Sequence, residues 1–214
     1  YSGGVGDLEK VYLLAKKYNL RVIEDAAHAF GGKYSKSKIG SFGDIVCFSF
    51  DGIKNITSGE GGCIVTSDEI VLKRARDARL LGVERDTEKR FTSNRSWKFN
   101  VKFQGWRYHM SNIMAAIGIE QLKKISEFSF KRQLLAMKYD ELLSNTPLIK
   151  ILNQNYHEVV PHIYPIQLNR ALDRDCVMLE LKKKGIETGI HYYPNHKLSI
   201  YHDSNINLIN TENI

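Results

Sequence analysis

Long hydrophobic runs and prolines are scarce in this chain. No apolar run approaches the length needed to cross a bilayer, and the sequence does not open on the basic and then apolar pattern of a signal peptide. Only 4 of the 214 residues are proline, while 43% are hydrophobic and 26% are charged, which is typical of a globular protein with a sizeable core. These features exclude a collagen, a disordered chain and a disulfide mini-scaffold, and we expect a soluble protein of the cytoplasm.

Cysteine is rare as well. The three cysteines, Cys47, Cys63 and Cys176, stand singly, without any C-x-x-C pair. An odd number of isolated cysteines favours buried free thiols in a reducing compartment over disulfides or a zinc site. The histidines after residue 190 also lack the helical H-x-x-x-H spacing that is typical of a metal site, so we predict no metal site.

Positive charge is concentrated in one segment. The formal net charge is +7, from 31 basic and 24 acidic residues. Residues 73–107 contain eleven Lys and Arg but four acidic residues, so the rest of the chain is balanced. Such a segment can bind nucleic acid, an anionic membrane face or a phosphorylated small substrate, or it can be a solvated helix face followed by a loop. No RNA-binding aromatic signature, zinc finger or clear helix-turn-helix accompanies it, so nucleic acid is a weak hypothesis.

Helical periodicity alternates with short β-rich runs along the chain. Asp7, and either Ser67 or Asp68, can cap the first two helices. The predicted helices cover residues 7–17, 68–81, 111–144 with a break near residue 126, and 173–184. The predicted strands cover residues 20–23, 44–50, 63–66, 148–152, 159–168 and 186–192. This alternation indicates an α/β layered fold, which binds its ligands outside the carboxyl ends of the strands.

Three linked motifs stand in the first third of the chain. They read E-D-A-A-H at residues 24–28, G-D-I-V-C-F-S-F at residues 43–50 and G-E-G-G at residues 59–62, with Lys54 between the last two. Together they resemble the DegT/DnrJ/EryC1/StrS family of sugar aminotransferases, which depend on pyridoxal phosphate (PLP). The resemblance extends from Gly3 to about Tyr201, and several motifs in the right order are far more specific than any one of them.

This resemblance implies an architecture. The fold is then α/β, of the PLP-dependent aspartate-aminotransferase type (fold type I), with a three-layer large domain and a smaller α/β carboxyl-terminal domain. Residues 1–125 correspond to the carboxyl-terminal portion of the PLP-binding large domain, and residues 126–214 to a small domain that is incomplete at its end. Because the sequence opens at Tyr1 without a Met, and lacks the family's amino-terminal part, we expect a piece of a longer chain. A homodimer is implied too, since family sites are built across two subunits.

Lys54 and Asp25 match the two positions that carry the cofactor chemistry in the family. PLP enzymes need a lysine whose amine bonds to the cofactor aldehyde and, once released, carries a proton. They also need a carboxylate that keeps the pyridine nitrogen protonated, and Asp25 follows a predicted buried strand, where a lone carboxylate would be costly. Strand alternation points the competing Glu24 to the opposite face. The alternatives are an ordinary surface lysine and an aspartate that forms a helix cap or a structural salt bridge.

Three further residues match cofactor-binding positions of the family. The resemblance places His28 beside the ring oxygen of PLP and Ser49 at its phosphate, although a structural histidine and a serine bonded to the backbone are the alternatives. Arg107 stands where the family usually has an asparagine that reaches the phosphate in the partner subunit, and His109 where arginine is common. A guanidinium can hold a phosphate strongly, so we retain Arg107 as a cofactor-binding candidate.

The substrate-binding candidates come from two segments. His191 and Tyr192 open a segment, H-Y-Y-P-N-H, that resembles the H-Y-x-P-x-H pattern near the substrate entrance of the family. Arg90 and Arg95 belong to the basic segment and are predicted to attract the diphosphate of a nucleotide sugar.

The matches imply a PLP-dependent transaminase. It would transfer an amino group from an amino acid, L-glutamate by family analogy, to a keto group of a nucleotide-linked deoxysugar, for surface polysaccharide or glycan biosynthesis. A PLP sugar dehydrase of the same fold is an alternative, although those dehydrases carry histidine at the position of Lys54. A non-enzymatic sensor or regulatory relative and a nucleic-acid-binding domain are the others. The first interpretation predicts amino-acid and nucleotide-sugar partners, and neither nucleic acid nor membrane.

Overall fold

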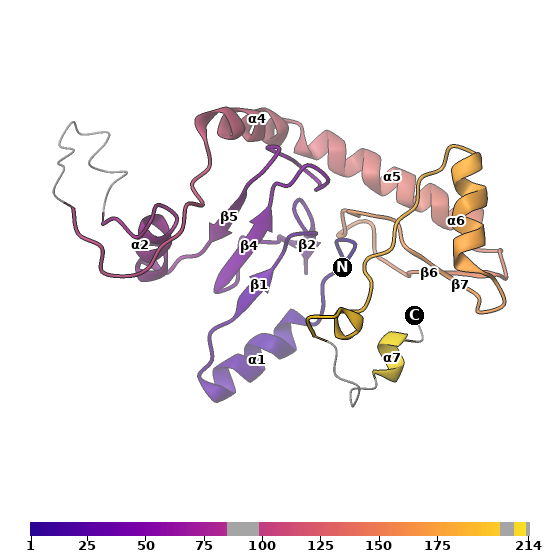
Figure 1. The fold of residues 1–214 in the computed structure, drawn as a ribbon, viewed down its shortest axis with the longest axis horizontal. Helices are drawn as coiled ribbons and strands as arrows, with labels where there is room; N and C mark the ends of the chain where they lie inside the picture. Colours follow the sequence, from indigo (N-terminus) through magenta and orange to yellow (C-terminus); the bar gives the residue numbers. More distant parts are fainter. Residues whose placement is uncertain (85–98, 202–207, 213–214) are drawn as a thin grey trace. The chain divides into compact units, whose positions relative to one another are not determined.

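The computed structural model describes residues 1–84, 99–201 and 208–212 of the chain. These divide into two compact units (Figure 1). Unit 1 comprises Tyr1–Tyr139 and Asn153–Tyr164, and unit 2 comprises Asp140–Leu152 and Pro165–Ile214. The boundary between the two units therefore lies after residue 139, whereas the predicted domain boundary lies after residue 125. Residues 153–164 belong to unit 1 again. The assignment of residues 1–125 and 126–214 to domains of the whole protein stays a prediction.

A three-stranded sheet forms the centre of unit 1 (Figure 1). Its strands are β1 (Ile23–Asp25), β4 (Ile45–Ser49) and β5 (Gly62–Val65), in the order β1-β4-β5. Strand β4 runs parallel to β1 and antiparallel to β5. A separate hairpin joins β2 (Lys33–Tyr34) to β3 (Ser37–Lys38). Strand β1 begins later along the chain than the strand predicted over residues 20–23. It therefore contains both acidic residues of the first motif, Glu24 and Asp25.

One face of the central sheet carries the core. Val46 and Phe48 of β4 are 1% and 8% exposed, and they pack with buried residues of the segment that follows β1 and of the turn after β3, namely Ala26, Ala29 and Ile39. Phe30 meets the Phe48 ring edge to face, with 5.1 Å between ring centroids. Because side chains alternate along a strand, the residues between these core positions lie on the other face.

Helices α1 (Leu8–Tyr18) and α2 (Glu69–Ala78) both begin at predicted caps. The Asp7 carboxylate accepts a hydrogen bond from the Lys10 backbone N–H at 3.1 Å. The Asp68 carboxylate accepts from the N–H groups of Ile70 and Val71 at 2.8 and 3.1 Å, which decides between the two residues predicted for that cap. Such bonds satisfy backbone donors that no helical carbonyl can reach.

The predicted long helix is two helices in succession. Helix α4 (Asn112–Lys123) is capped by Ser111 and ends at Lys124, and α5 (Ile125–Leu143) follows at once. The break was therefore predicted two residues too late. Helix α4 packs on the sheet end of unit 1 through Gly118, where a Cβ would lie 3.5 Å from the Ser58 side chain.

Unit 2 contains a short hairpin and helices. Strands β6 (Ile149–Ile151) and β7 (Ile166–Leu168) pair antiparallel, and α6 (Arg174–Lys183) follows, capped by Asp173. The chain then forms the 3₁₀ helix η1 (Asn195–Lys197) and α7 (Ile209–Glu212). The predicted strand over residues 186–192 is wrong, because these residues form no ladder with another described segment.

The predicted strand over residues 159–168 is mostly wrong as well. Only its last three residues form β7, whereas residues 159–163, which we call the returning segment, belong to unit 1. Pro161 and Pro165 have no backbone N–H, so this stretch cannot donate a full set of ladder hydrogen bonds. Side chains of unit 1 bind its carbonyl groups instead.

The three cysteines are free thiols, as predicted, but they are not all buried. Cys47 and Cys63 are partly buried in the sheet, while Cys176 is exposed on α6. Within the described ranges, no helix has the length and apolarity that a bilayer crossing requires.

Candidate active site

Lys54 lies on a tightly bonded loop that joins β4 to β5. The Asp51 carboxylate accepts from the Ile53 N–H at 3.1 Å, and the Lys54 N–H donates to the Asp51 carbonyl at 3.1 Å. Farther along, the Ser58 N–H returns to the Phe50 carbonyl at 2.9 Å. The Lys54 side chain is half-buried. Hydrogen bonds thus fix the backbone from which the amine extends.

Asp25 is the last residue of β1, at the carboxyl edge of the sheet. It pairs in register with Cys47 of β4, and its carboxylate accepts from the Ala27 N–H at 3.0 Å. Asp25 is exposed, which corrects the expectation of a buried strand end. Burial raises the pKa of the Cys47 thiol, and the negative charge of Asp25 adds to the effect.

Glu24 is engaged elsewhere. Its carboxylate accepts a hydrogen bond of 2.5 Å from the Tyr12 hydroxyl of α1, and the Asp44 backbone N–H donates to the same hydroxyl at 2.9 Å. A Cβ atom added to Gly43 would lie 3.0 Å from the Tyr12 hydroxyl oxygen and 2.4 Å from a Glu24 carboxylate oxygen. Strand alternation therefore separates the two neighbouring carboxylates as predicted, with Glu24 bound to α1.

Ser49 shares the face of the sheet that carries Asp25. Paired residues of neighbouring strands point to the same side, and Ser49 follows Cys47, the partner of Asp25, by two residues. Strand spacing and rise put the Cα atoms of Asp25 and Ser49 about 8 Å apart. The partly buried Ser49 hydroxyl accepts from the Asp51 N–H at 3.3 Å.

These three side chains keep polar capacity for a ligand. Among the described residues, nothing forms an ion pair or hydrogen bond with the Lys54 amine. Asp25 uses its Oδ1 for the Ala27 N–H, and Ser49 uses its oxygen as an acceptor, so Asp25 Oδ2 and the Ser49 hydroxyl proton stay available. An amine, a carboxylate and a hydroxyl at one sheet edge, the last two about 8 Å apart, fit an aldehyde with a basic ring nitrogen and an anionic arm.

His28 lies in the turn that follows β1, and its ring packs on another histidine. The centroids of the His28 and His162 rings are 4.2 Å apart, with an interplanar angle of 45°. His28 is partly buried and His162 is 5% exposed. The ring of Tyr1 lies on His28 as well, 6.2 Å away. A structural role for His28 and a role beside a cofactor are both compatible with this packing.

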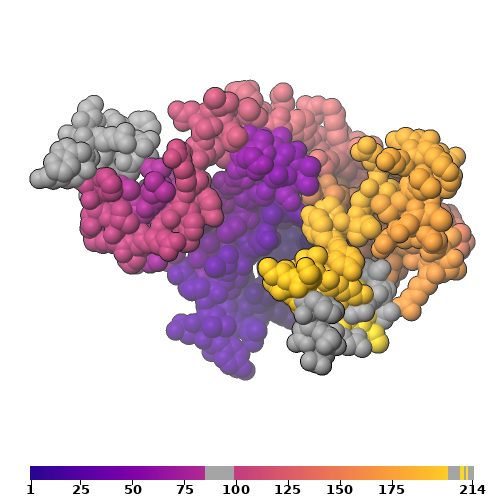
Figure 2. All heavy atoms as spheres, viewed as in Figure 1, coloured from indigo at the N-terminus to yellow at the C-terminus, as the bar shows by residue number. Residues whose placement is uncertain are grey.

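Arg107 is exposed. The segment before α4, to which it belongs, has its atoms beside those of α2 in Figure 2. Arg107 forms an isolated bridge with Leu80, and the neighbouring Trp106 N–H donates to the Ala78 carbonyl at 2.7 Å. Three residues later, Met110 reaches the Lys54 region, because a Cβ on Gly61 would lie 2.4 Å from its terminal methyl group. No hydrogen bond or ion pair in the described structure joins Arg107 to the Lys54 loop, and its role stays a prediction.

The described residues of unit 1 contain none of the substrate-binding candidates. Arg90 and Arg95 lie outside the described residues. His191 and Tyr192 belong to unit 2, where their rings pack with centroids 4.4 Å apart and Tyr192 is 70% exposed. Their predicted roles are untested.

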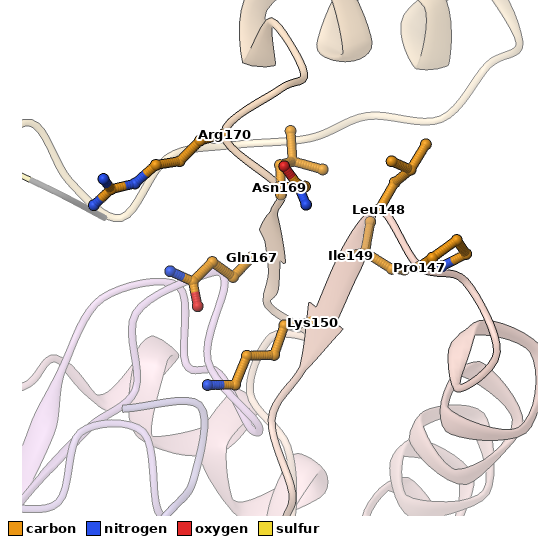
Figure 3. A pocket seen from close by; sticks show the side chains of 8 residues that line it. Pro147, Leu148, Ile149, Lys150, Gln167, Asn169 and Arg170 are labelled. Atoms are coloured by element: carbon orange, nitrogen blue, oxygen red, sulfur yellow. The ribbon is translucent and has the colours of Figure 1, made fainter.

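A hollow lies in unit 2, on the β6–β7 hairpin. It encloses about 380 Å³, and the side chains of Lys150, Gln167 and Arg170 extend to the same side of it (Figure 3). It contains none of the predicted site residues. Across the described part of the chain, His, Cys, Asp and Glu side chains form no group of three or more that could hold a metal.

Two buried residues next to the site were missed by sequence reasoning. Asn55, directly after Lys54, is 4% exposed, and His162 contacts His28 from 134 positions along the chain. A polar residue in a loop is expected to be exposed, so the local sequence does not indicate that Asn55 is buried. The contact of His162 depends on the returning segment, which was predicted to be a strand.

Comparison with known proteins relates this arrangement to one family and its structures. The model of the DegT/DnrJ/EryC1/StrS aminotransferase family matches residues 1–214. The uncharacterized protein MJ1066 of Methanocaldococcus jannaschii is 38% identical over 209 residues, which cover 94% of this chain and 53% of that protein. The chain thus spans about half the length of the curated relative that it matches.

Solved structures agree with the fold. Helicobacter pylori PseC, an aminotransferase involved in the biosynthesis of pseudoaminic acid, superposes with a TM-score of 0.83 at 29% identity, over 94% of this chain and 53% of PseC. Spr1654 of Streptococcus pneumoniae, solved in a PLP form, has a TM-score of 0.76 at 25% identity, over 94% of this chain and 55% of Spr1654. This likeness confirms the mixed α/β fold of the fold type I aminotransferases. The three-layer arrangement and the small domain stay predictions.

Proposed function

Because the chain belongs to the DegT/DnrJ/EryC1/StrS aminotransferase family, we propose that the protein transfers an amino group from an amino acid to a sugar ketone, with PLP bound at Lys54. The donor is L-glutamate, and the acceptor is a nucleotide-linked deoxysugar used for surface polysaccharide or glycan biosynthesis. One observation supports the proposal: Asp25 and Ser49 end two parallel strands at one edge of the sheet, Lys54 follows on the loop after the second strand, and all three side chains have uncommitted polar atoms.

Each of the three side chains has a defined task. The Lys54 amine holds the cofactor and, once displaced by the substrate amine, moves the proton at the reacting carbon. The Asp25 carboxylate keeps the pyridine nitrogen protonated, and the Ser49 hydroxyl donates to the phosphate. PLP, when bound, supplies the electron sink that stabilises the substrate carbanion.

The remaining predicted residues extend the site. His28 lies in the turn after Asp25 and orients the cofactor ring oxygen. Arg107 is exposed, so it is accessible to the phosphate of a partner subunit in a homodimer. His191 and Tyr192 contact the sugar, and Arg90 and Arg95 attract the diphosphate.

The decisive experiment is borohydride reduction of the full-length protein in the presence of PLP, followed by peptide mapping. Label on the peptide that contains Lys54 supports both cofactor and site, and label on another lysine contradicts the site. A Lys54→Arg variant is the matched control, because it keeps the positive charge and cannot be trapped by reduction.

The alternatives separate in a second measurement. A transaminase loses its near-visible PLP absorbance when L-glutamate is added and recovers it with a keto acceptor. A sensor or regulatory relative would keep its absorbance unchanged. A dehydrase would release water from the sugar without consuming glutamate.

A further inference from the structure

One buried side chain ties the Lys54 loop to two other segments of unit 1. The Asn55 Nδ2 atom donates to the Phe30 carbonyl oxygen at 3.0 Å and to the Val160 carbonyl oxygen at 3.2 Å. Phe30 follows His28 by two residues, and Val160 lies in the returning segment. The Asn55 carboxamide therefore joins the loops that carry two of the predicted cofactor residues, Lys54 and His28.

The returning segment is a fixed support for this side chain. Val160 is 2% exposed, and its carbonyl oxygen would lie 2.3 Å from a Cβ on Gly3. Gln133 of α5 donates to the Val159 carbonyl at 3.2 Å. Arg132, also on α5, donates to the carbonyls of the two residues that follow Val160, Pro161 and His162, at 3.3 and 3.1 Å. Because side chains of α5 bind carbonyl groups on both sides of Val160, the acceptor that Asn55 meets has little freedom to move.

The same segment also touches His28 directly. The buried His162 ring packs against the His28 ring with centroids 4.2 Å apart. The returning segment thus meets the site twice, once through the His162 ring and once through the Val160 carbonyl. A shift of this segment would move His28 and the Lys54 loop together.

Asparagine suits this position because its Nδ2 atom carries two protons. Both are directed to carbonyl groups, while the buried Oδ1 atom has no hydrogen-bond partner in the described part of the chain. A leucine of similar size would leave two carbonyl oxygens without a donor. An aspartate would direct negative charge at them.

We propose that Asn55 is a positioning residue, which fixes the place of the Lys54 amine relative to His28 by clamping the Lys54 loop to the turn after β1 and to the returning segment. This inference rests on the proposed function, since it assigns Asn55 a role through Lys54. Asn55 touches no reacting atom and acts through the backbone of its neighbour.

The test compares Asn55→Leu with Gln133→Met in the full-length protein. Both variants remove hydrogen bonds to the returning segment, but Gln133 lies on α5 and has no bond to the Lys54 loop. We expect Asn55→Leu to lower kcat at least about tenfold, as the loss of two buried hydrogen bonds allows, with KM for glutamate changed less than about threefold. Gln133→Met should leave both constants within about twofold.

A spectroscopic readout separates positioning from loss of stability. The pH midpoint of the near-visible absorbance of the PLP-loaded protein depends on the surroundings of the lysine amine. It should therefore shift in Asn55→Leu and stay unchanged in Gln133→Met, at matched thermal stability. Asn55→Asp keeps the shape and removes the donors, so it should behave as Asn55→Leu does. If the leucine variant does not fold, Asn55→Ser, which keeps one donor, takes its place. It should then differ from Gln133→Met in kcat and in the pH midpoint in the same direction.

The outcomes are distinguishable from those of the proposed function. If borohydride does not label Lys54 in the wild-type protein, the proposed function fails. If the wild-type protein is labelled and active, but the Asn55 variants change kcat and the pH midpoint no more than Gln133→Met does, the positioning role is overturned.

Discussion

Replacing Tyr12 with phenylalanine is expected to destabilise the protein by about 2 kcal/mol at neutral pH, and by less as the pH rises above 10. The hydroxyl donates to Glu24 at 2.5 Å and accepts from the Asp44 N–H at 2.9 Å. Phenylalanine removes both bonds and leaves a half-buried carboxylate beside an apolar ring. Each lost bond costs about 1 kcal/mol, and somewhat more where one group is charged, which gives the total.

The pH dependence follows from the proton on the same hydroxyl. Burial, and then the hydrogen bond to Glu24, raises the pKa of Tyr12 from 10.0 to about 12. Since the folded state holds this proton more tightly than the unfolded state, the stabilisation is complete below pH 10 and is lost as the pH rises from 10 towards 12. The full difference corresponds to at most about 2.7 kcal/mol, which partial exposure of the hydroxyl reduces to about 1 kcal/mol.

Urea unfolding of the full-length wild-type and Tyr12→Phe proteins from about pH 8 to about pH 11 measures this effect. Other titrating groups cancel in the difference between the two proteins, which should shrink above pH 10. Tyr18→Phe is the matched control, because Tyr18 is on the same helix and is 59% exposed. A Tyr12→Phe difference that is constant across this range, or equal to that of Tyr18→Phe, would refute the reasoning.

Three more predictions concern the site and its supports. Asp25→Asn should weaken PLP binding at least about tenfold in an absorbance titration, since the pyridinium loses its counter-charge, whereas Glu24→Gln should leave that affinity within about twofold because Glu24 is bound to α1. Gly3→Ala should lower the free energy of unfolding by at least about 2 kcal/mol in urea, because φ is +82° and the new Cβ would lie 2.3 Å from a carbonyl oxygen of the returning segment. Charge reversal of Arg90 and Arg95 together should raise KM for the nucleotide sugar and leave the glutamate half-reaction unchanged, and unchanged kinetics in a two-substrate assay would contradict their role.

Several features were predicted from sequence because their causes are local. Asp7 and Asp68 cap helices with side-chain bonds that span two or three residues. Asp25 and Ser49 lie at the ends of β-rich runs, and parallel strands bring their carboxyl ends to one edge. The opposite orientations of Glu24 and Asp25 need only the two-residue period of a strand.

The wrong predictions concern pairing. Residues 186–192 have the composition of a strand, yet a strand exists only where a neighbour supplies hydrogen bonds. The returning segment has the same composition, but Pro161 and the side chains of α5 keep it out of a ladder. The exposure of Asp25 likewise depends on which segments cover the sheet, and no local pattern contains that information.

The amino-acid sequence by itself determined the order of the motifs, the caps, and the residue types that meet at the sheet edge, because periodicity and short-range hydrogen bonds depend on neighbours in the chain. Tertiary structure alone decided that Asn55 is buried between two carbonyl groups and that His162 packs on His28. Those contacts join residues separated by 25, 105 and 134 positions, and only the packing of α5 and the returning segment brings them together.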